Sequence, residues 1–235
     1  MSRFTTVFWD VDNTLLDFAY SQRCALGNCF LTIHRVLTED MLKRYSQIND
    51  SYWKRLELGE ITKEELLNGR FTTFFREYGI TDVDVNAFRT QYQEELGCHF
   101  AYLDDSLTIC KELQGKVKQY VVTNGVVYTQ RKKLELSGLL QIMDGVFISE
   151  EIGAPKPHQE FFSHCLERIE ERDKDKIILI GDSLTSDIKG GAMAGIVTCW
   201  YRPKSSTNNS QYRPDYEISN LHEIFQILEE KETKR

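Results

Sequence analysis

Short apolar runs alternate with longer helical patterns over most of the chain. Residues 4–9 form a run of apolar and β-branched residues that stops at Asp10, which is typical of a buried strand. Further runs of this kind occur at 120–123, 145–148, 177–180 and 197–200. Helical patterns lie between them, at 105–113, 129–137, 159–171 and 185–194. This alternation predicts an α/β fold, a Rossmann-like, doubly wound parallel sheet with helices on both faces.

One long stretch breaks the alternation. From 18 to 100 the pattern is helical, with no convincing strand. Thr62 to Glu65 reads as a capping box that opens a helix, and Gly79 is placed to end it. Another helix is expected at 38–58, where apolar residues recur every three or four positions. We therefore predict a core made of 1–17 and 101–235, with a helical domain of 18–100 inserted into it.

The C-terminal part is expected to form a loop followed by a helix. Residues 202–214 are rich in Ser, Asn and Pro and are expected to form a loop, and 220–231 are expected to form a terminal helix.

Composition narrows the classes of function. The 235 residues carry a net charge of −7, which argues against a nucleic-acid polymer as partner because Lys and Arg supply phosphate affinity. No apolar run approaches the length of a transmembrane helix, and a carboxylate at Asp10 interrupts any leader-like run, so we expect no membrane partner. The six cysteines form no C-x-x-C pair, which favours a reduced, cytoplasmic setting. We expect a monomer or a small homo-oligomer.

Polar residues follow the end of each predicted strand. In open α/β sheets, ligands bind beyond the carboxyl ends of the strands. We therefore expect carboxylates, hydroxyls and one lysine to converge at this edge of the sheet. The residues concerned are Asp10, Asp12 and Thr14 after the first strand, Thr123 and Asn124 after the second, Lys156 after the third, and Asp182, Ser183 and Asp187 after the fourth.

Such a set of side chains suits a metal-bound phosphate. Neighbouring carboxylates raise one another's pKa unless a hard cation neutralises them, and oxygen ligands suit Mg²⁺. Lys156, Thr123 and the backbone amides around Asn124 can donate hydrogen bonds to a phosphate. One carboxylate can attack the phosphoryl group, while a second protonates the leaving oxygen and later activates water. The residues thus predict Mg²⁺-assisted phosphoryl transfer to water or to another acceptor.

Four ordered motifs resemble those of the haloacid dehalogenase-like (HAD) hydrolases. They are Asp10-x-Asp12-x-Thr14, Thr123-Asn124-Gly125, Lys156 before Pro157, and Gly181-Asp182-Ser183-x₃-Asp187. A carboxylate pair alone is a weak signal, whereas four motifs in order across the chain are highly specific. The resemblance implies that the helical insertion is a C1-type cap that closes over the site.

The resemblance also implies a role for each matched residue. Asp10 would be the nucleophile, and Asp12 the general acid/base with its backbone carbonyl on Mg²⁺. The other implied roles are metal binding by Asp182 together with Asp10 and Asp12, phosphate binding by Thr123, Asn124 and the catalytic Lys156, and a place on or beside the metal for Asp187, Thr14 and Ser183.

Two longer motifs favour one branch of the family. The Asp-x-Asp-Asn-Thr-Leu-x-Asp start and the Gly-x-Pro-Lys-Pro loop resemble the pyrimidine 5′-nucleotidases, so a nucleoside 5′-monophosphate is the expected substrate. Phosphoglycolate or another small organic phosphate remains an alternative. A sugar-phosphate mutase and a haloacid dehalogenase are less favoured, the latter because its chemistry needs neither Asp12 nor a metal. A phospho-acceptor receiver domain is shorter and lacks the helical insertion.

Other chemically capable residues are expected to be structural. Aromatic residues of the insertion that recur at helical spacing are interpreted as packing, and these are Tyr45, Tyr52, Phe71, Phe74 and Phe75. Trp53 lies off that stripe and is a candidate for the substrate pocket. The cysteines are interpreted as core residues, and the five histidines lack metal-ligand spacing, with only His158 close to a motif.

Overall fold

The computed structural model describes residues 3–202 and 211–229. They form two compact units, one built from the chain up to Phe18 and from Ala101 onward, the other from Ala19–Phe100. Most of the predicted loop at 202–214, and the end of the predicted helix at 220–231, lie outside the described residues.

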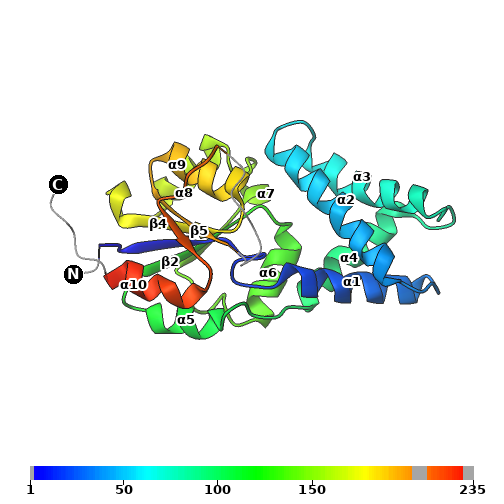
Figure 1. Ribbon diagram of the computed structural model, residues 1–235, viewed down its shortest axis with the longest axis horizontal. Helices are drawn as coiled ribbons and strands as arrows, with labels where there is room; N and C mark the ends of the chain where they lie inside the picture. Colours follow the sequence, from blue (N-terminus) through cyan, green and yellow to red (C-terminus); the bar gives the residue numbers. More distant parts are fainter. Residues whose placement is uncertain (1–2, 203–210, 230–235) are drawn as a thin grey trace. The chain divides into compact units, whose positions relative to one another are not determined.

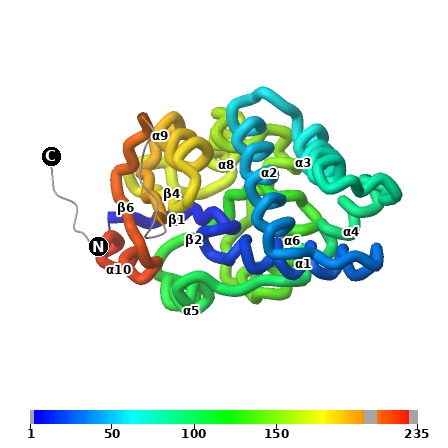
Figure 2. Tube along the Cα trace, turned by 45° about the vertical axis from the view of Figure 1, so that its right-hand side comes forward, coloured from blue at the N-terminus to red at the C-terminus, as the bar shows by residue number. Residues whose placement is uncertain are grey.

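A six-stranded parallel sheet forms the centre of the first unit, in the order β3-β2-β1-β4-β5-β6. The doubly wound α/β fold is thus confirmed, and Figure 2 shows β1 between β2 and β4. The strands are β1 (Thr6–Trp9), β2 (Lys118–Thr123), β3 (Gly145–Ile148), β4 (Ile177–Gly181), β5 (Val197–Tyr201) and β6 (Tyr216–Ile218). Among the strands that the structure describes, only β6, a three-residue edge strand, was not predicted by the apolar pattern.

The unbroken apolar runs reflect burial of the strands on both faces. Every residue of β1, β4 and β5 is buried, as expected for parallel strands covered by helices. Polar groups inside this layer are paired: the Trp9 indole donates to the Gln119 side-chain oxygen at 3.1 Å, and the Gln119 amide donates to the Cys110 carbonyl at 2.8 Å. The sheet therefore offers a rigid platform whose carboxyl edge carries the polar residues.

Helices lie on both faces of the sheet (Figure 1), with α8 and α9 on one side and α5 and α10 on the other. The helices of this unit are α5 (Ser106–Leu113), α6 (Val127–Leu136), α7 (Ser149–Ile152), α8 (Gln159–Arg168), α9 (Lys189–Ala194) and α10 (Ile224–Glu229). Single turns occur at Lys174–Lys176 and Leu221–Glu223. The helix predicted at 185–194 is in fact a π-helical turn, η2 (Leu184–Ile188), that continues into α9.

The second unit is helical and has its own aromatic core. The helices are α1 (Phe18–Thr32), α2 (Glu39–Glu57), α3 (Lys63–Glu77) and α4 (Val85–Cys98). The capping box is confirmed, since the Glu65 amide donates to the Thr62 hydroxyl at 3.2 Å and the Thr62 amide donates to the Glu65 carboxylate at 2.7 Å. Gly79, at φ 63°, follows the end of α3 as predicted.

Most of the aromatic residues predicted to pack do so. Tyr45 stacks on Phe71 with ring centroids 5.2 Å apart, and both are fully buried. Tyr52 is the exception: it is only partly buried and lines an open hollow of about 520 Å³ between α2 and α3, where its hydroxyl lies 2.9 Å from that of Thr73. Trp53 is also partly buried, with the Lys63 ammonium 5.4 Å from the centre of its ring.

Candidate active site

Asp10 stands at the carboxyl end of the central strand β1. Its backbone N–H donates to the Ile180 carbonyl on β4 at 2.9 Å, so the strand ladder itself fixes its position. The chain then turns through Asn13, whose φ of 62° is a conformation that Asn tolerates better than most residues. This turn returns the buried Thr14 hydroxyl to 3.4 Å from Asp10 Oδ2.

Lys156 reaches the same point from the loop between α7 and α8. Its Nζ donates to Asp10 Oδ1 at 2.7 Å, to Asp187 Oδ1 at 2.6 Å and to the Val122 carbonyl at 2.8 Å. An ammonium has three protons, so each of them has an acceptor here. The side chain is almost fully buried, and its charge is balanced by the two carboxylates.

Asn124 holds the loop that carries this lysine. Its side chain donates to the Lys156 carbonyl at 2.9 Å and accepts from the Lys156 amide at 2.8 Å. The neighbouring Thr123 ends β2, and its buried hydroxyl accepts from the Gly125 amide at 3.1 Å. The Asn124 side chain therefore positions Lys156, and its predicted role towards phosphate remains a prediction, as does that of Thr123.

Asp182 and Asp187 follow the end of β4. The Asp187 carboxylate accepts from the Ser183 amide at 3.1 Å and lies so close to Gly181 that a Cβ there would sit 2.3 Å from its Cγ. The Ser183 hydroxyl accepts from the Ser186 amide at 3.1 Å and so caps the helical turn. The Asp182 carbonyl accepts from the Trp200 indole at 2.8 Å, which ties this loop to β5.

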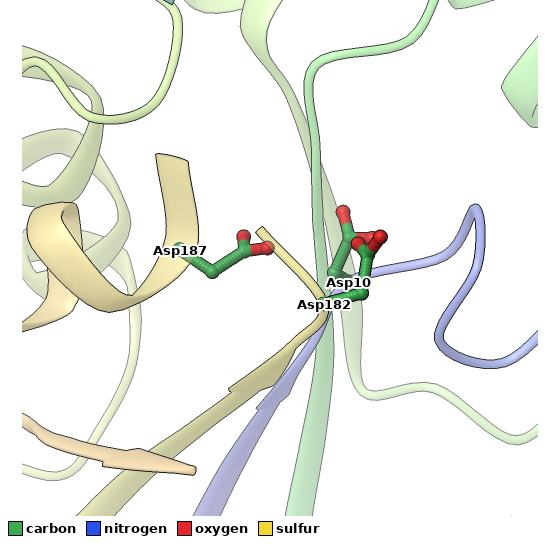
Figure 3. A group of neighbouring side chains, drawn as sticks. All are labelled: Asp10, Asp182 and Asp187. Carbon is green, nitrogen blue, oxygen red and sulfur yellow. The ribbon is translucent and has the colours of Figure 1, made fainter. Parts of the chain in front are cut away.

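Asp10, Asp182 and Asp187 bring their carboxylates together (Figure 3). One carboxylate oxygen from each lies within 4.8 Å of the others, and Asp187 extends from its helical turn towards the ends of the two strands. Sequence reasoning expected Asp10, Asp12 and Asp182 to converge. The group of three contains Asp187, which was also expected at this edge, whereas the Asp12 carboxylate is held by side chains of α6; metal binding through the Asp12 backbone carbonyl remains a prediction.

Burial and mutual repulsion set the ionisation of this group. Desolvation, opposed by Lys156 and reinforced by Asp187, raises the pKa of Asp10 from 3.8 to about 7. Desolvation and the neighbouring Asp10 raise the pKa of Asp182 well above its usual value. Burial alone would lower the pKa of Lys156, but Asp10 and Asp187 outweigh it and raise the pKa. Lys156 thus stays charged, while three carboxylates share one cation.

This donor set fits a hard divalent cation. Three carboxylates and one ammonium leave an excess negative charge in a desolvated site, and oxygen ligands of this kind are those that Mg²⁺ takes. The Asp10 and Asp182 carboxylates could hold the ion together with the Asp12 backbone carbonyl. Asp187 lies close enough to contribute as well.

The Asp12 side chain is held by two side chains of α6. Lys133 Nζ donates to Asp12 Oδ1, and Gln130 Nε2 donates to Asp12 Oδ2, both at 2.6 Å. Sequence reasoning missed Gln130 and Lys133. Helical spacing places them on the same face of α6 as the buried Leu134, and that signal could have identified them.

The remaining candidates lie apart from the chemistry. His158 is exposed at the start of α8. Four cysteines are buried as predicted, whereas Cys24 is partly buried and Cys98 exposed, and all six are free thiols. Among the described residues, no helix combines the length and apolar character needed to span a bilayer.

Fold and site together define an α/β enzyme with a carboxylate-rich centre at the carboxyl edge of a parallel sheet. A family model described as haloacid dehalogenase-like hydrolase matches residues 4–195, so the chain belongs to this family of hydrolases. The match includes all four motifs, from Asp10 to Asp187.

Three relatives match this chain over nearly the whole length of both proteins. YfnB of Bacillus subtilis (strain 168), named as a HAD-hydrolase, is 38% identical over 97% of both chains. A crystal structure of YfnB bound to magnesium has a TM-score of 0.92 and covers 97% of this chain and 100% of that one. Pyrimidine 5′-nucleotidase PynA of Streptococcus pneumoniae (strain ATCC BAA-255 / R6) is 33% identical over 95% of this chain and 94% of its own. Pyrimidine 5′-nucleotidase YjjG of Escherichia coli (strain K12) is 29% identical over 94% of this chain and 96% of its own.

Proposed function

We propose that this hydrolase is a Mg²⁺-dependent phosphomonoesterase that transfers the phosphoryl group to Asp10 and then to water. The observation that carries the proposal is the position of the Asp10 carboxylate. It is held at the strand edge by Lys156 at 2.7 Å and Thr14 at 3.4 Å, beside Asp182 and Asp187. A fixed carboxylate beside a cation site can act as a nucleophile towards a bound phosphate.

The first step forms a bond between an Asp10 oxygen and phosphorus and breaks the bond between phosphorus and the ester oxygen. Asp12, in its protonated form, gives its proton to the leaving oxygen, so that the product leaves as an alcohol. The electron pair of the broken bond stays on that oxygen. Asp10 then carries the phosphoryl group as an aspartyl phosphate.

The second step returns Asp10 to its initial state. Asp12, now a carboxylate, takes a proton from a water molecule as the water oxygen attacks phosphorus. The bond between Asp10 and phosphorus breaks, and inorganic phosphate leaves. One group thus serves as acid and then as base within a single turnover.

Other residues of the edge bind and orient the phosphate. The donors that we assign to its oxygens are the Thr123 hydroxyl, the backbone amides at Asn124 and Gly125, and Lys156. Lys156 would exchange one of its three present acceptors for a phosphate oxygen, and the Gly125 amide would exchange the Thr123 hydroxyl for one. A bound Mg²⁺ supplies positive charge against the phosphoryl oxygens, which an edge of three carboxylates would otherwise repel. We assign that ion to Asp10, Asp12 and Asp182, with Asp187 on it or beside it.

For substrate, we propose a pyrimidine nucleoside 5′-monophosphate. The names of PynA and YjjG support this class. We assign the choice of leaving group to the helical unit Ala19–Phe100, which we propose acts as a cap. Phosphoglycolate or another small organic phosphate is the alternative.

Phosphate release from a substrate panel tests the proposal. With Mg²⁺, we expect kcat/KM for UMP, dUMP or dTMP to be at least about tenfold above that for purine monophosphates and phosphoglycolate, as for a fitted pocket. Chelation should abolish activity, and added Mg²⁺ should restore it. Full turnover in excess chelator would contradict the metal role. A preference for phosphoglycolate would reject the nucleotidase assignment and leave the proposed phosphatase mechanism in place.

A further inference from the structure

The carboxylate of Asp12 is held at two points by one helix. Lys133 and Gln130 are three residues apart on α6, so their side chains project from the same face. Each contacts a different oxygen of Asp12 at 2.6 Å. Both side chains are buried, with exposed fractions of 0% for Lys133 and 1% for Gln130.

Burial of Lys133 is not explained by packing alone. A buried ammonium is costly unless it is paired with an opposite charge. The Lys133 ammonium donates to Asp12, and the centre of the Phe18 ring lies 5.8 Å from Nζ. The buried Lys133 ammonium is therefore paired with the Asp12 carboxylate.

Gly125 makes room for the second contact. A Cβ at this position would lie 2.3 Å from Gln130 Nε2 and 2.4 Å from its Cγ, so any larger residue would push the Gln130 side chain away. The glycine of the Thr-Asn-Gly motif thus leaves room for the Gln130 side chain that contacts Asp12. Gly125, Gln130 and Lys133 thus all contribute to the contacts that hold Asp12.

We propose that Lys133 and Gln130 are positioning residues that fix the Asp12 carboxylate for its two proton transfers, a role that rests on the proposed function of Asp12. A carboxylate oxygen can accept two hydrogen bonds, so one contact per oxygen orients the group and leaves a lone pair for the proton that Asp12 gives to the leaving oxygen and takes back from water. Orientation matters because a misplacement of about 1 Å can cost about 10²-fold in rate.

Lys133→Met tests this role, since it keeps the length of the side chain and removes the ammonium. We expect kcat for a nucleoside monophosphate to fall by about 10- to 100-fold while KM changes little. The loss should be smaller for p-nitrophenyl phosphate in the phosphorylation step, because its leaving group departs without a proton. Lys132→Met is the matched control. It removes a positive charge from the same helix, but Lys132 lies against Tyr128, with 5.5 Å from Nζ to the ring centre, and should keep wild-type kcat.

A double-mutant cycle separates positioning from a general structural effect. If Lys133 acts through Asp12, then Lys133→Met should cause no further loss in an Asp12→Asn background. Gln130→Met, which removes the other contact, should act in the same direction and serves where Lys133→Met lowers Tm too far for assay.

Two results would overturn the inference. One is wild-type kcat in both Lys133→Met and Gln130→Met while Asp12→Asn is slow. The other is a loss in the Asp12→Asn background as large as in the wild type. A wild-type protein that hydrolyses neither ester would instead contradict the proposed function, and the inference with it. Assay of the wild-type enzyme therefore distinguishes the two kinds of failure.

Discussion

Asp10 and Asp12 are two residues apart and lie in contrasting surroundings. Asp10 shares one cation, Lys156, with Asp187 and faces Asp182, and its pKa is raised to about 7. Asp12 has its own cation, Lys133, and lies outside the group of three carboxylates. Enzymes that use two carboxylates in different roles separate them by environment in this way.

Removing either carboxylate should affect turnover differently. Asp10→Asn keeps the shape of the side chain but loses the attacking anion, so covalent catalysis should stop. Asp12→Asn should still allow attack while slowing proton transfer, with kcat lower by about 10²- to 10⁴-fold. Steady-state kinetics on purified variants measure both effects. An Asp10→Asn variant at the wild-type rate would remove Asp10 from the mechanism.

The raised pKa of Asp10 also predicts a pH dependence of stability in the chelated protein. Between its usual value of 3.8 and about 7, the folded state binds more protons at Asp10 than the unfolded state does. The contribution of Asp10 to stability is therefore present at low pH and lost as pH rises through this window. In EDTA, Tm of the wild type should fall relative to that of Asp10→Asn between pH 5 and pH 8. A difference in Tm that does not change with pH would contradict the raised pKa.

At the scale of the element, the turn between β4 and η2 depends on Gly181. A Cβ there would collide with the Asp187 carboxylate, which pairs with Lys156 at 2.6 Å. Gly181→Ala should displace Asp187, weaken Mg²⁺ binding in a calorimetric titration, and cost about 1–3 kcal/mol in stability. Gly27→Ala is the control, since a Cβ at Gly27 in α1 meets nothing within 4 Å. It should leave Mg²⁺ binding unchanged and stabilise the helix by about 0.5–1 kcal/mol. Equal effects of the two substitutions would contradict the role assigned to Gly181.

The elements that the sequence predicted well are the central strands of the sheet. Central parallel strands are buried on both faces, so β1 and β4 appear as unbroken apolar runs with polar residues directly after them. The edge strand β6 has only three residues, two of them not fully buried, and lacks such a run.

The details of the edge depend on side-chain direction, which a linear pattern does not contain. The motifs indicated Asp10, Asp182, Asp187 and Lys156 at this edge, but they did not show that Asp187 joins Asp10 and Asp182 while α6 holds the Asp12 carboxylate. Lys133 lies on the helix face of the buried Leu134, but it also stands in a run of charged residues that resembles a solvated face, and the sequence alone does not show its pairing with Asp12.

At the scale of the whole molecule, the chain forms two compact units. Every residue to which we assign chemistry lies in the first unit, where the sheet edge fixes it. The second unit has a separate core, in which the buried Arg70 donates to Asn49 at 2.7 Å and lies 5.0 Å from the centre of the Phe71 ring. We propose that this unit selects the leaving group and leaves the phosphoryl chemistry unchanged, so that substitutions on it should alter KM and substrate preference more than metal binding.

Identification of the phosphorylated residue tests the central claim most directly. The enzyme is mixed with Mg²⁺ and substrate, quenched with acid during turnover, and its peptides are mapped by mass spectrometry. Because an Asp10 oxygen is the proposed attacking atom, the phosphoryl group should be found on Asp10 and should be missing from the Asp10→Asn variant. Phosphate trapped on any other residue, or a phosphorylated Asp10→Asn variant, would contradict the mechanism.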